Sequence, residues 1–174
     1  QTDHLALWDH LMDCGAPHGM EFSSTHALTI RRIEGGILGN GTDITPDMTP
    51  FEAGLAPFVN MEKGDFIGRT ALLKKEKQCC LFGLTCSTET PAAGARVFDS
   101  GTEVGRITAG SPSPTLGLGI GYVHFNAPGD WVGRTLAMRL PNGSLHDAQI
   151  VQPPFFDLDK KIVRGLDRSC LLYT

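Results

Sequence analysis

Two arginines and a glutamate lie close together at Arg31, Arg32 and Glu34, directly before a Gly-Gly pair. A guanidinium group can bind a carboxylate or a phosphate through two parallel hydrogen bonds, so these residues could orient an anionic ligand. The same residues could instead form an ion pair that stabilises the fold. The pattern by itself leaves both interpretations open.

The histidines and cysteines do not show the spacing of a metal or thiol site. There is no HExxH motif and no paired Cys/His spacing, and the one helical i, i+4 pair, His10 with Cys14, supplies only two of the ligands that zinc needs. Cys79, Cys80 and Cys86 lie in apolar, strand-like sequence, where a free cysteine usually packs as a small hydrophobic residue. We therefore expect neither a metal site nor a cysteine nucleophile.

The glycine motif GxGxG at Gly117, Gly119 and Gly121 does not indicate a nucleotide site. A pyrophosphate site requires a strand, a tight turn and then a helix whose N-terminus faces the phosphates. The sequence around these glycines is strand-like and no helical pattern follows it. Close packing of strands in a barrel is the better explanation.

The composition of the 174 residues is that of a soluble globular domain, with 41% hydrophobic and 20% charged residues. A net charge of -4 argues against a nucleic-acid or anionic-membrane partner, so small molecules or proteins fit better. Five cysteines cannot all pair within one chain, which indicates reduced thiols. We expect a cytoplasmic protein, or one of the mitochondrial matrix if the source is eukaryotic, with no membrane span.

Secondary-structure patterns predict helices in the first part of the chain. An amphipathic helix is expected over 3–15, with Asp3 as its N-cap and Gly15 as its stop. Residues 27–33 form a second ordered segment, either helix or strand, and 65–77 contain a short helix. The segment 39–50 is rich in Gly, Asn, Asp and Pro, which is typical of an extended connector between two structural units.

Beyond Gln78 the pattern changes to short apolar runs that are separated by turn residues. Hairpin signals occur at Ser100-Gly101 and Asn142-Gly143, where glycine permits the positive φ of a tight turn. About six strands with no long helix between them favour a closed barrel or a sandwich. The expected fold class is α+β and mostly β, with an antiparallel, jelly-roll-like β-barrel as the C-terminal domain after a partial domain that contains helices.

Several blocks of the sequence, in order, resemble the glycine-cleavage T-protein family. The family patterns are RxExG, YGxDI, TPxEAGL, K-DFIGR-AL, G-xT-G-xSP and PFYD. The corresponding blocks here are Arg32 to Gly36, Gly39 to Ile44, Thr49 to Leu55, Lys63 with Asp65 to Leu72, Val104 to Ser113, and Pro154 to Asp157. The resemblance extends from about residue 5 to residue 166.

The resemblance implies a domain organisation. Family members are three-domain enzymes around a central channel that binds tetrahydrofolate, and their last domain is a jelly-roll β-barrel. Residues 1–50 would then be the C-terminal piece of the folate-binding middle domain and 51–78 a connector with a short helix. Residues 79–166 would be the barrel, and 167–174 a tail.

The resemblance also implies a chemistry, the transfer of a one-carbon unit to N5 of folate by proximity and general acid-base catalysis. The family's catalytic aspartate lies in the N-terminal domain, so no residue of this chain is assigned a catalytic role, and whether the chain is itself an enzyme stays open. Aminomethyltransferases carry an arginine where this sequence has Leu28. That difference points away from glycine cleavage in the strict sense and towards the dehydrogenase-type and demethylase relatives.

From the resemblance we expect a C-terminal fragment of a tetrahydrofolate-dependent aminomethyl or methyl transferase that forms one wall of the folate channel. Candidate cofactor-binding residues are Arg32, Glu34 and Arg106. Expected partners are folate, a one-carbon donor and the N-terminal domain of the same protein. The alternatives are a non-catalytic binding or assembly module, and part of a folate-dependent S- or O-demethylase.

Overall fold

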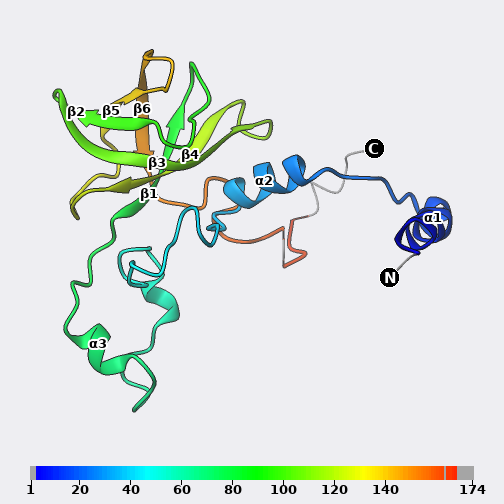
Figure 1. The fold of residues 1–174 in the computed structure, drawn as a ribbon, viewed down its shortest axis with the longest axis horizontal. Helices are drawn as coiled ribbons and strands as arrows, with labels where there is room; N and C mark the ends of the chain where they lie inside the picture. Colours follow the sequence, from blue (N-terminus) through cyan, green and yellow to red (C-terminus); the bar gives the residue numbers. More distant parts are fainter. Residues whose placement is uncertain (1–2, 163, 168–174) are drawn as a thin grey trace.

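A computed structural model describes residues 3–162 and 164–167. A six-stranded β-barrel forms the body of the molecule, and helices α1, α2 and α3 lie outside it (Figure 1). The α+β, mostly β class is therefore confirmed. The strands are β1 (Leu81–Cys86), β2 (Arg96–Asp99), β3 (Thr102–Ser113), β4 (Leu118–Phe125), β5 (Thr135–Arg139) and β6 (Leu145–Val151).

The barrel closes in the order β1-β4-β3-β2-β5-β6, and every neighbouring pair is antiparallel. Closure leaves no unpaired strand edge, because β6 returns to pair with β1 from Gly83↔Val151 to Thr85↔Gln149. The predicted hairpin turn at Ser100-Gly101 joins β2 to β3, and both residues have positive φ, at 50° and 86°. Of the two outcomes predicted for the strands, the barrel is the one that forms.

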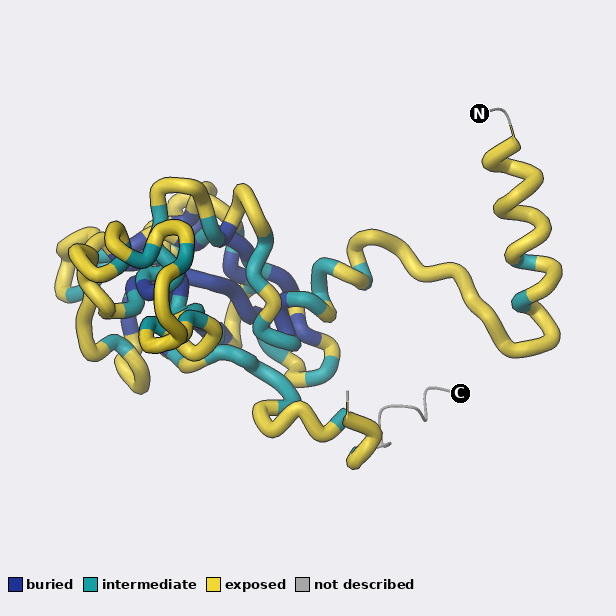
Figure 2. Tube along the Cα trace, turned by 90° about the horizontal axis from the view of Figure 1, so that it is seen from below, coloured by how far each residue is buried: buried dark blue, intermediate teal, exposed yellow. Residues whose placement is uncertain are grey.

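The barrel interior is filled by alternate residues of all six strands. Phe125 is fully buried in this interior; it stacks on Trp131 at 4.1 Å between ring centroids and meets Phe82 edge to face at 5.8 Å. Figure 2 shows the buried residues concentrated in this part of the molecule. The buried cluster consists of Phe82, Leu84, Cys86, Ala95, Val97, Ile107, Val123, Phe125, Leu136, Met138, Leu140, Ala148 and Ile150.

The glycines of the GxGxG motif allow a loop to lie close against the barrel wall. A Cβ atom on Gly119 would come within 2.3 Å of the Glu89 carbonyl oxygen, and one on Gly121 within 2.5 Å of the Ala109 carbonyl oxygen. Gly119 and Gly121 lie within β4, so the motif is not followed by a helix. Close packing of backbones explains these two glycines.

Helix α2 (Thr25–Glu34) settles the uncertain segment as a helix. Ser24 caps its N-terminus by accepting a hydrogen bond from the Ala27 N–H at 3.3 Å, which satisfies one of the free donors of the first turn. The helix packs on the outside of the barrel through the fully buried Ile33. A second apolar cluster, formed by Ile33 with Leu81, Ala109, Ile120 and Tyr122, joins the helix to the outer wall.

Helix α1 (His4–Gly15) lies apart from the barrel, at the end of an extended segment that leads to α2 (Figures 1 and 2). The α-helix follows Asp3 and ends at Gly15, as the sequence predicts. Two details differ: Asp3 makes no side-chain cap bond in the described structure, and a 3-10 turn, η1 (Ala16–His18), follows Gly15 directly. The chain turns at Gly19, because its φ of 70° is left-handed and cannot continue a right-handed helix.

Between α2 and the barrel the chain forms turns, a 3-10 helix η2 (Ala56–Phe58) and the short helix α3 (Arg69–Leu73). The segment 39–50 is a series of tight turns with one bridge, Asn40↔Ile44, rather than an extended connector. Helix α3 is shorter than the predicted range because Gly68, at φ 92°, prevents a helix from starting earlier. In the described part of the chain, no helix has both the length and the apolar character required to cross a membrane.

Candidate functional site

The end of α2 and the turns that follow it meet the outer wall of the barrel around a buried carboxylate, Asp43. Its side chain is 0% exposed and accepts three hydrogen bonds. The donors are Nη1 of Arg32 at 2.6 Å, the N–H of Gly39 at 2.7 Å and Oγ1 of Thr108 at 2.6 Å. A buried charge is tolerated when it is paired and fully hydrogen-bonded, so this network joins α2, the turn after it and β3.

Arg32 is held by this network but keeps donors available for a ligand. Both of the bonds that it donates, to Asp43 and to the Ile37 carbonyl at 3.2 Å, come from Nη1. Guanidinium also carries N–H groups on Nε and Nη2, and no residue of the described chain accepts from these. The side chain is 25% exposed. The orientation of the Arg32 guanidinium is therefore fixed by Asp43 and Ile37, while its other N–H groups remain available to a ligand.

A surface hollow of about 390 Å³ adjoins this guanidinium. Leu28 and Ile37 are 64% and 62% exposed, so the hollow combines apolar surface with positive charge. Such a combination suits a ligand that has both a flat or apolar part and an anionic group. The residues that line the hollow are Thr25, Leu28, Thr29, Arg31, Arg32 and Ile37.

Glu34, in contrast, is enclosed within the fold. It is 2% exposed and accepts hydrogen bonds from Nη1 of Arg31 at 2.9 Å, from Oγ of Ser113 at 2.6 Å and from the N–H of Thr115 at 3.4 Å. Burial raises the pKa of Glu34, but the bonds from Ser113, Thr115 and Arg31 together outweigh burial and hold the pKa below its ordinary value. These contacts favour the structural interpretation of the Arg-Glu group for Glu34, and its assignment to cofactor binding stays a prediction.

The lowered pKa of Glu34 predicts that this carboxylate contributes to stability only while it is ionised. Its contribution should be complete above the unfolded-state value of 4.5 and should be lost as the pH falls through the lower folded-state value. Urea unfolding from pH 7 down to the acid limit should show a shallower loss of stability below pH 4.5 for Glu34→Gln than for the parent protein. The exposed Glu62→Gln should follow the parent curve, and identical acid slopes for Glu34→Gln and the parent would contradict the prediction.

Arg106 lies elsewhere, on the exposed outer face of β3. It is opposite His124 of β4, and none of the described contacts joins it to Arg32 or Glu34. Burial lowers the pKa of His124, and the charge of Arg106 lowers it further. The structure thus brings Arg32 and Glu34 to opposite sides of one helix end. Arg106 lies on β3 two residues before Thr108, the residue that bonds Asp43, and makes no described contact with Arg32 or Glu34.

Sequence reasoning did not single out Thr108 and Ser113, and it assigned Asp43 to connector architecture. All three are central to the contacts between α2 and the barrel. A signal was present, because Asp43 lies in the GNGTDI block and both hydroxyl residues lie in the block from Val104 to Ser113. Which carboxylate each hydroxyl would meet depends on the tertiary arrangement, and no spacing along the chain encodes that.

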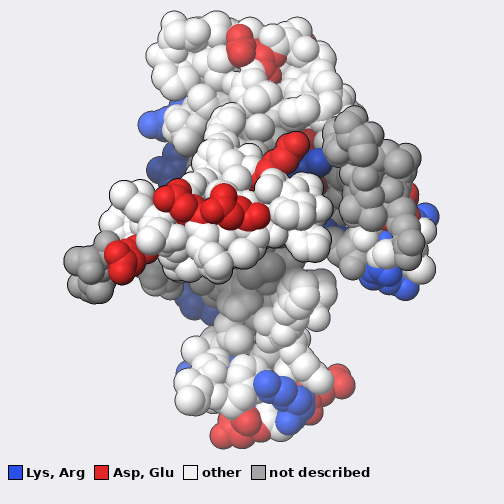
Figure 3. Space-filling model, turned by 90° about the vertical axis from the view of Figure 1, so that its right-hand side faces the viewer, with Lys and Arg blue, Asp and Glu red and all other residues white. Residues whose placement is uncertain are grey.

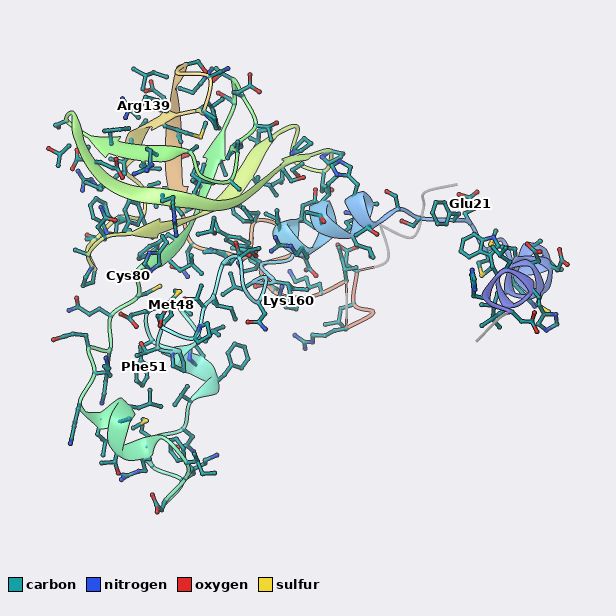
Figure 4. All side chains as sticks on the ribbon, in the orientation of Figure 1. Glu21, Met48, Phe51, Cys80, Arg139 and Lys160 are labelled. Atoms are coloured by element: carbon teal, nitrogen blue, oxygen red, sulfur yellow. The ribbon has the colours of Figure 1, made fainter. Side chains whose placement is uncertain are left out.

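The chain after β6 also holds α2 in place. The N–H groups of Phe155 and Phe156 donate to the Glu34 carbonyl at 3.1 and 3.0 Å, and Nζ of Lys160 donates to the Gly35 carbonyl at 2.6 Å (Figure 4). These bonds satisfy carbonyl groups that the end of a helix leaves free. The ring of Phe155 packs on Tyr122 at 5.8 Å between centroids.

Two of the thiols in the described structure, Cys79 and Cys80, show no sign of activation. Burial raises the pKa of both Cys79 and Cys80, so these groups stay protonated and are poor nucleophiles. Among the residues that the structure describes, no three His, Cys, Asp or Glu side chains are close enough to hold a metal ion. Cys170 lies outside the described residues.

The fold and the site together define a chain of two parts, a helical segment and a closed antiparallel barrel, joined through buried carboxylates. Residues 1–63 match the family model of the GCVT N-terminal domain, and residues 77–157 match that of the glycine cleavage T-protein C-terminal barrel domain. The chain belongs to the glycine cleavage T-protein family and contains the C-terminal part of its architecture, including the β-barrel.

Curated relatives agree with this assignment. An aminomethyltransferase of Saccharopolyspora erythraea is 33% identical over 161 residues, which is 89% of this chain and 44% of the relative. That of Streptomyces avermitilis is 33% identical over 167 residues, 91% of this chain and 45% of the relative. The crystal structure of the glycine cleavage system aminomethyltransferase T from Bartonella henselae superposes with a TM-score of 0.74 at 28% identity, over 88% of this chain and 44% of that one. The chain spans less than half the length of these relatives.

Proposed function

We propose that this chain is the C-terminal part of a tetrahydrofolate-dependent aminomethyl or methyl transferase, in which it contributes one wall of the folate channel. The observation that carries the proposal is Arg32, which Asp43 holds in place through Nη1 and which lines the hollow beside Leu28 and Ile37. Tetrahydrofolate has a flat ring system and a glutamate end with carboxylates, so it matches both the apolar and the cationic surface of this hollow. We propose that Glu34 supports this wall of the folate channel through its hydrogen bond with Ser113 of the barrel. Arg106 is proposed as a further folate contact, at the edge of the barrel.

Leu28 indicates which members of the family share the activity. In the resemblance stated above, aminomethyltransferases have an arginine at this position, and here an exposed leucine lines the hollow instead. A hydrophobic residue cannot bind an anionic group, so we propose an activity outside strict glycine cleavage. The second candidate function is accordingly a folate-dependent S- or O-demethylase, which would yield 5-methyltetrahydrofolate rather than 5,10-methylenetetrahydrofolate.

The exposed surface of α1 supports a partner from the same protein. Leu5, Trp8 and Leu11 lie at three-residue steps on one side of the helix and are 69%, 46% and 52% exposed, so α1 presents an apolar face to water. Figure 3 shows a line of acidic side chains over this end of the molecule, beside uncharged surface. We propose that the remainder of the N-terminal domain, as it occurs in the longer relatives, covers the apolar face of α1.

Calorimetry with tetrahydrofolate tests the proposal, on this chain and on a version extended upstream. Arg32→Lys keeps a positive charge beside Asp43 but removes the Nε and Nη2 donors, so we expect folate binding by the extended protein to weaken about tenfold. Arg164→Lys, an exposed arginine outside the site, serves as the matched control and should bind as the parent does. Mass spectrometry of the folate product separates transferase from demethylase activity.

Two outcomes would count against the proposal in different ways. If the extended protein binds no tetrahydrofolate, the enzyme proposal is lost and the alternative of a non-catalytic assembly module is favoured. If Arg32→Lys binds folate as tightly as the parent, the extended protein still uses folate but the hollow beside Arg32 is not part of its channel.

A further inference from the structure

A row of basic side chains crosses the outer wall of the barrel on four adjacent strands. Arg96 of β2 is directly opposite Arg106 of β3 on one side and Arg139 of β5 on the other. Arg106 is in turn opposite His124 of β4. Directly opposite residues of antiparallel strands project from the same face, so these four side chains form a continuous row. We call Arg96, Arg106, Arg139 and His124 the basic row.

The basic row is unusual because like charges in directly opposite positions destabilise a sheet. Among the arginines of the row only Arg96 has an acidic partner in the described structure, Glu103. His124 has Glu52 as an acidic neighbour, and burial lowers its pKa, so it is largely uncharged at neutral pH. The guanidinium of Arg139 lies over the ring of Phe98, 4.3 Å from its centroid, which holds the group in place without neutralising it. For Arg106 no described residue provides a hydrogen-bond acceptor or an ion pair. Arg106 and Arg139 thus remain as uncompensated cations on either side of Arg96, in a chain whose net charge is -4.

The surroundings of the basic row have the composition of a protein interface. Arg139 is opposite Leu145, which is 65% exposed, and the half-buried Phe98 lies beneath its guanidinium. Arginine, aromatic and exposed aliphatic side chains together are typical of protein contact surfaces. Since the barrel is closed, a partner cannot add a strand to the sheet and must lie on this face. In Figure 4 Arg139 lies on the part of the barrel remote from Cys80 and Met48. His124, at the other end of the row, is opposite Leu81, the residue after Cys80, so Arg139 marks the end of the row that is remote from Cys80.

We propose that the basic row is a docking surface for the acidic face of a partner protein. The guanidinium groups of Arg106 and Arg139 project from the same face on either side of β2 and can each bind a carboxylate of an acidic protein surface. A nucleic-acid backbone fits less well, because Glu103 and Asp99 lie beside the row as partners of Arg96 and Arg134 and would repel a uniform line of phosphates. Interspersed acids instead give the mixed pattern by which proteins select a partner.

Fluorescence anisotropy with a labelled polyglutamate peptide of about 20 residues tests the proposal at low ionic strength, where surface charges act over roughly 10 Å or more. We expect Arg106→Gln and Arg139→Gln each to weaken binding about threefold or more, and the double variant about tenfold. Arg164→Gln is the matched control and should leave binding unchanged. Sodium chloride should weaken binding by the parent more than by the double variant.

Three outcomes would overturn the proposal: no binding of the peptide by the parent protein, an equal loss in the Arg164→Gln control, or tighter binding of an oligothymidylate of the same charge. The third would indicate a nucleic-acid partner. Melting curves exclude an effect through folding, since removing a neighbouring like charge should leave the melting temperature unchanged or raise it. If Arg106→Gln is unstable, the peptide binding of Arg139→Gln alone tests the proposal, because Arg139 lies on a different strand, β5.

Discussion

Replacing Asp43 with alanine is expected to lower the free energy of unfolding by about 3–5 kcal/mol, because it breaks a buried ion pair and leaves the other charge without a partner. The side chain of Arg32 would stay three-quarters buried, and the N–H of Gly39 and the hydroxyl of Thr108 would each lose an acceptor. Urea unfolding followed by circular dichroism measures the change. Such a loss is a large fraction of the stability of an ordinary domain.

Asp159→Ala is the matched control for this prediction. Asp159 forms an ion pair with Lys161 at 3.0 Å, but its side chain is 71% exposed. Exposed pairs contribute about 0–1 kcal/mol, so this variant should unfold almost as the parent does. Comparable effects of the two substitutions would show that the Asp43 network does not hold α2 on the barrel.

The barrel could be predicted from sequence because its determinants are local. Apolar alternation and turn glycines indicate strands wherever they occur, and the hairpin at Ser100-Gly101 follows from residues that accept positive φ. The limits of the helices were harder to predict. Helix α1 ends at Gly15 as expected, yet that glycine has an ordinary helical φ of -80°, and the left-handed residue that ends the following 3-10 turn is Gly19. A glycine permits a helix to end but does not require it.

The candidate site could be predicted only in part, because its geometry depends on contacts between distant segments. Arg32 and Glu34 were recognised from their spacing, but their different environments were not. Glu34 meets Ser113, 79 residues further along, and Asp43 meets Thr108, 65 residues further along. Residue types can indicate that a carboxylate needs partners, whereas only the folded chain shows which ones it has.

Removing the aromatic centre of the barrel should have an effect as large as the loss of Asp43. Phe125→Ala is expected to lower the free energy of unfolding by about 3–5 kcal/mol. The substitution loses the transfer free energy of a fully buried ring and leaves a cavity in its place. Its stacking with Trp131 and its edge contact with Phe82 would be lost as well. Chemical denaturation and the near-ultraviolet signal of Trp131 both report this change.

Phe58→Ala removes the same side chain from a position that is 84% exposed, and it should change the unfolding free energy by no more than about 0.5 kcal/mol. A loss below about 1 kcal/mol for Phe125→Ala would mean that the barrel interior can collapse around the missing ring. That outcome would contradict the prediction that the contacts of Phe125 with Phe82 and Trp131 stabilise the barrel interior.

The pairing that closes the barrel also decides how the barrel is attached to the rest of the chain. Because the start of β1 lies beside the end of β6, at Gly83↔Val151, the polypeptide enters and leaves the barrel at neighbouring points. The covalent connections to the barrel are therefore close together, and by themselves they do not fix its orientation. Asp43 and Glu34 form hydrogen bonds to β3 and to the turn after it, at some distance from these connections. These bonds restrict the rotation of the barrel relative to α2. The orientation of the barrel relative to α2 thus depends on contacts between side chains, in which the two carboxylates act together with the apolar cluster around Ile33.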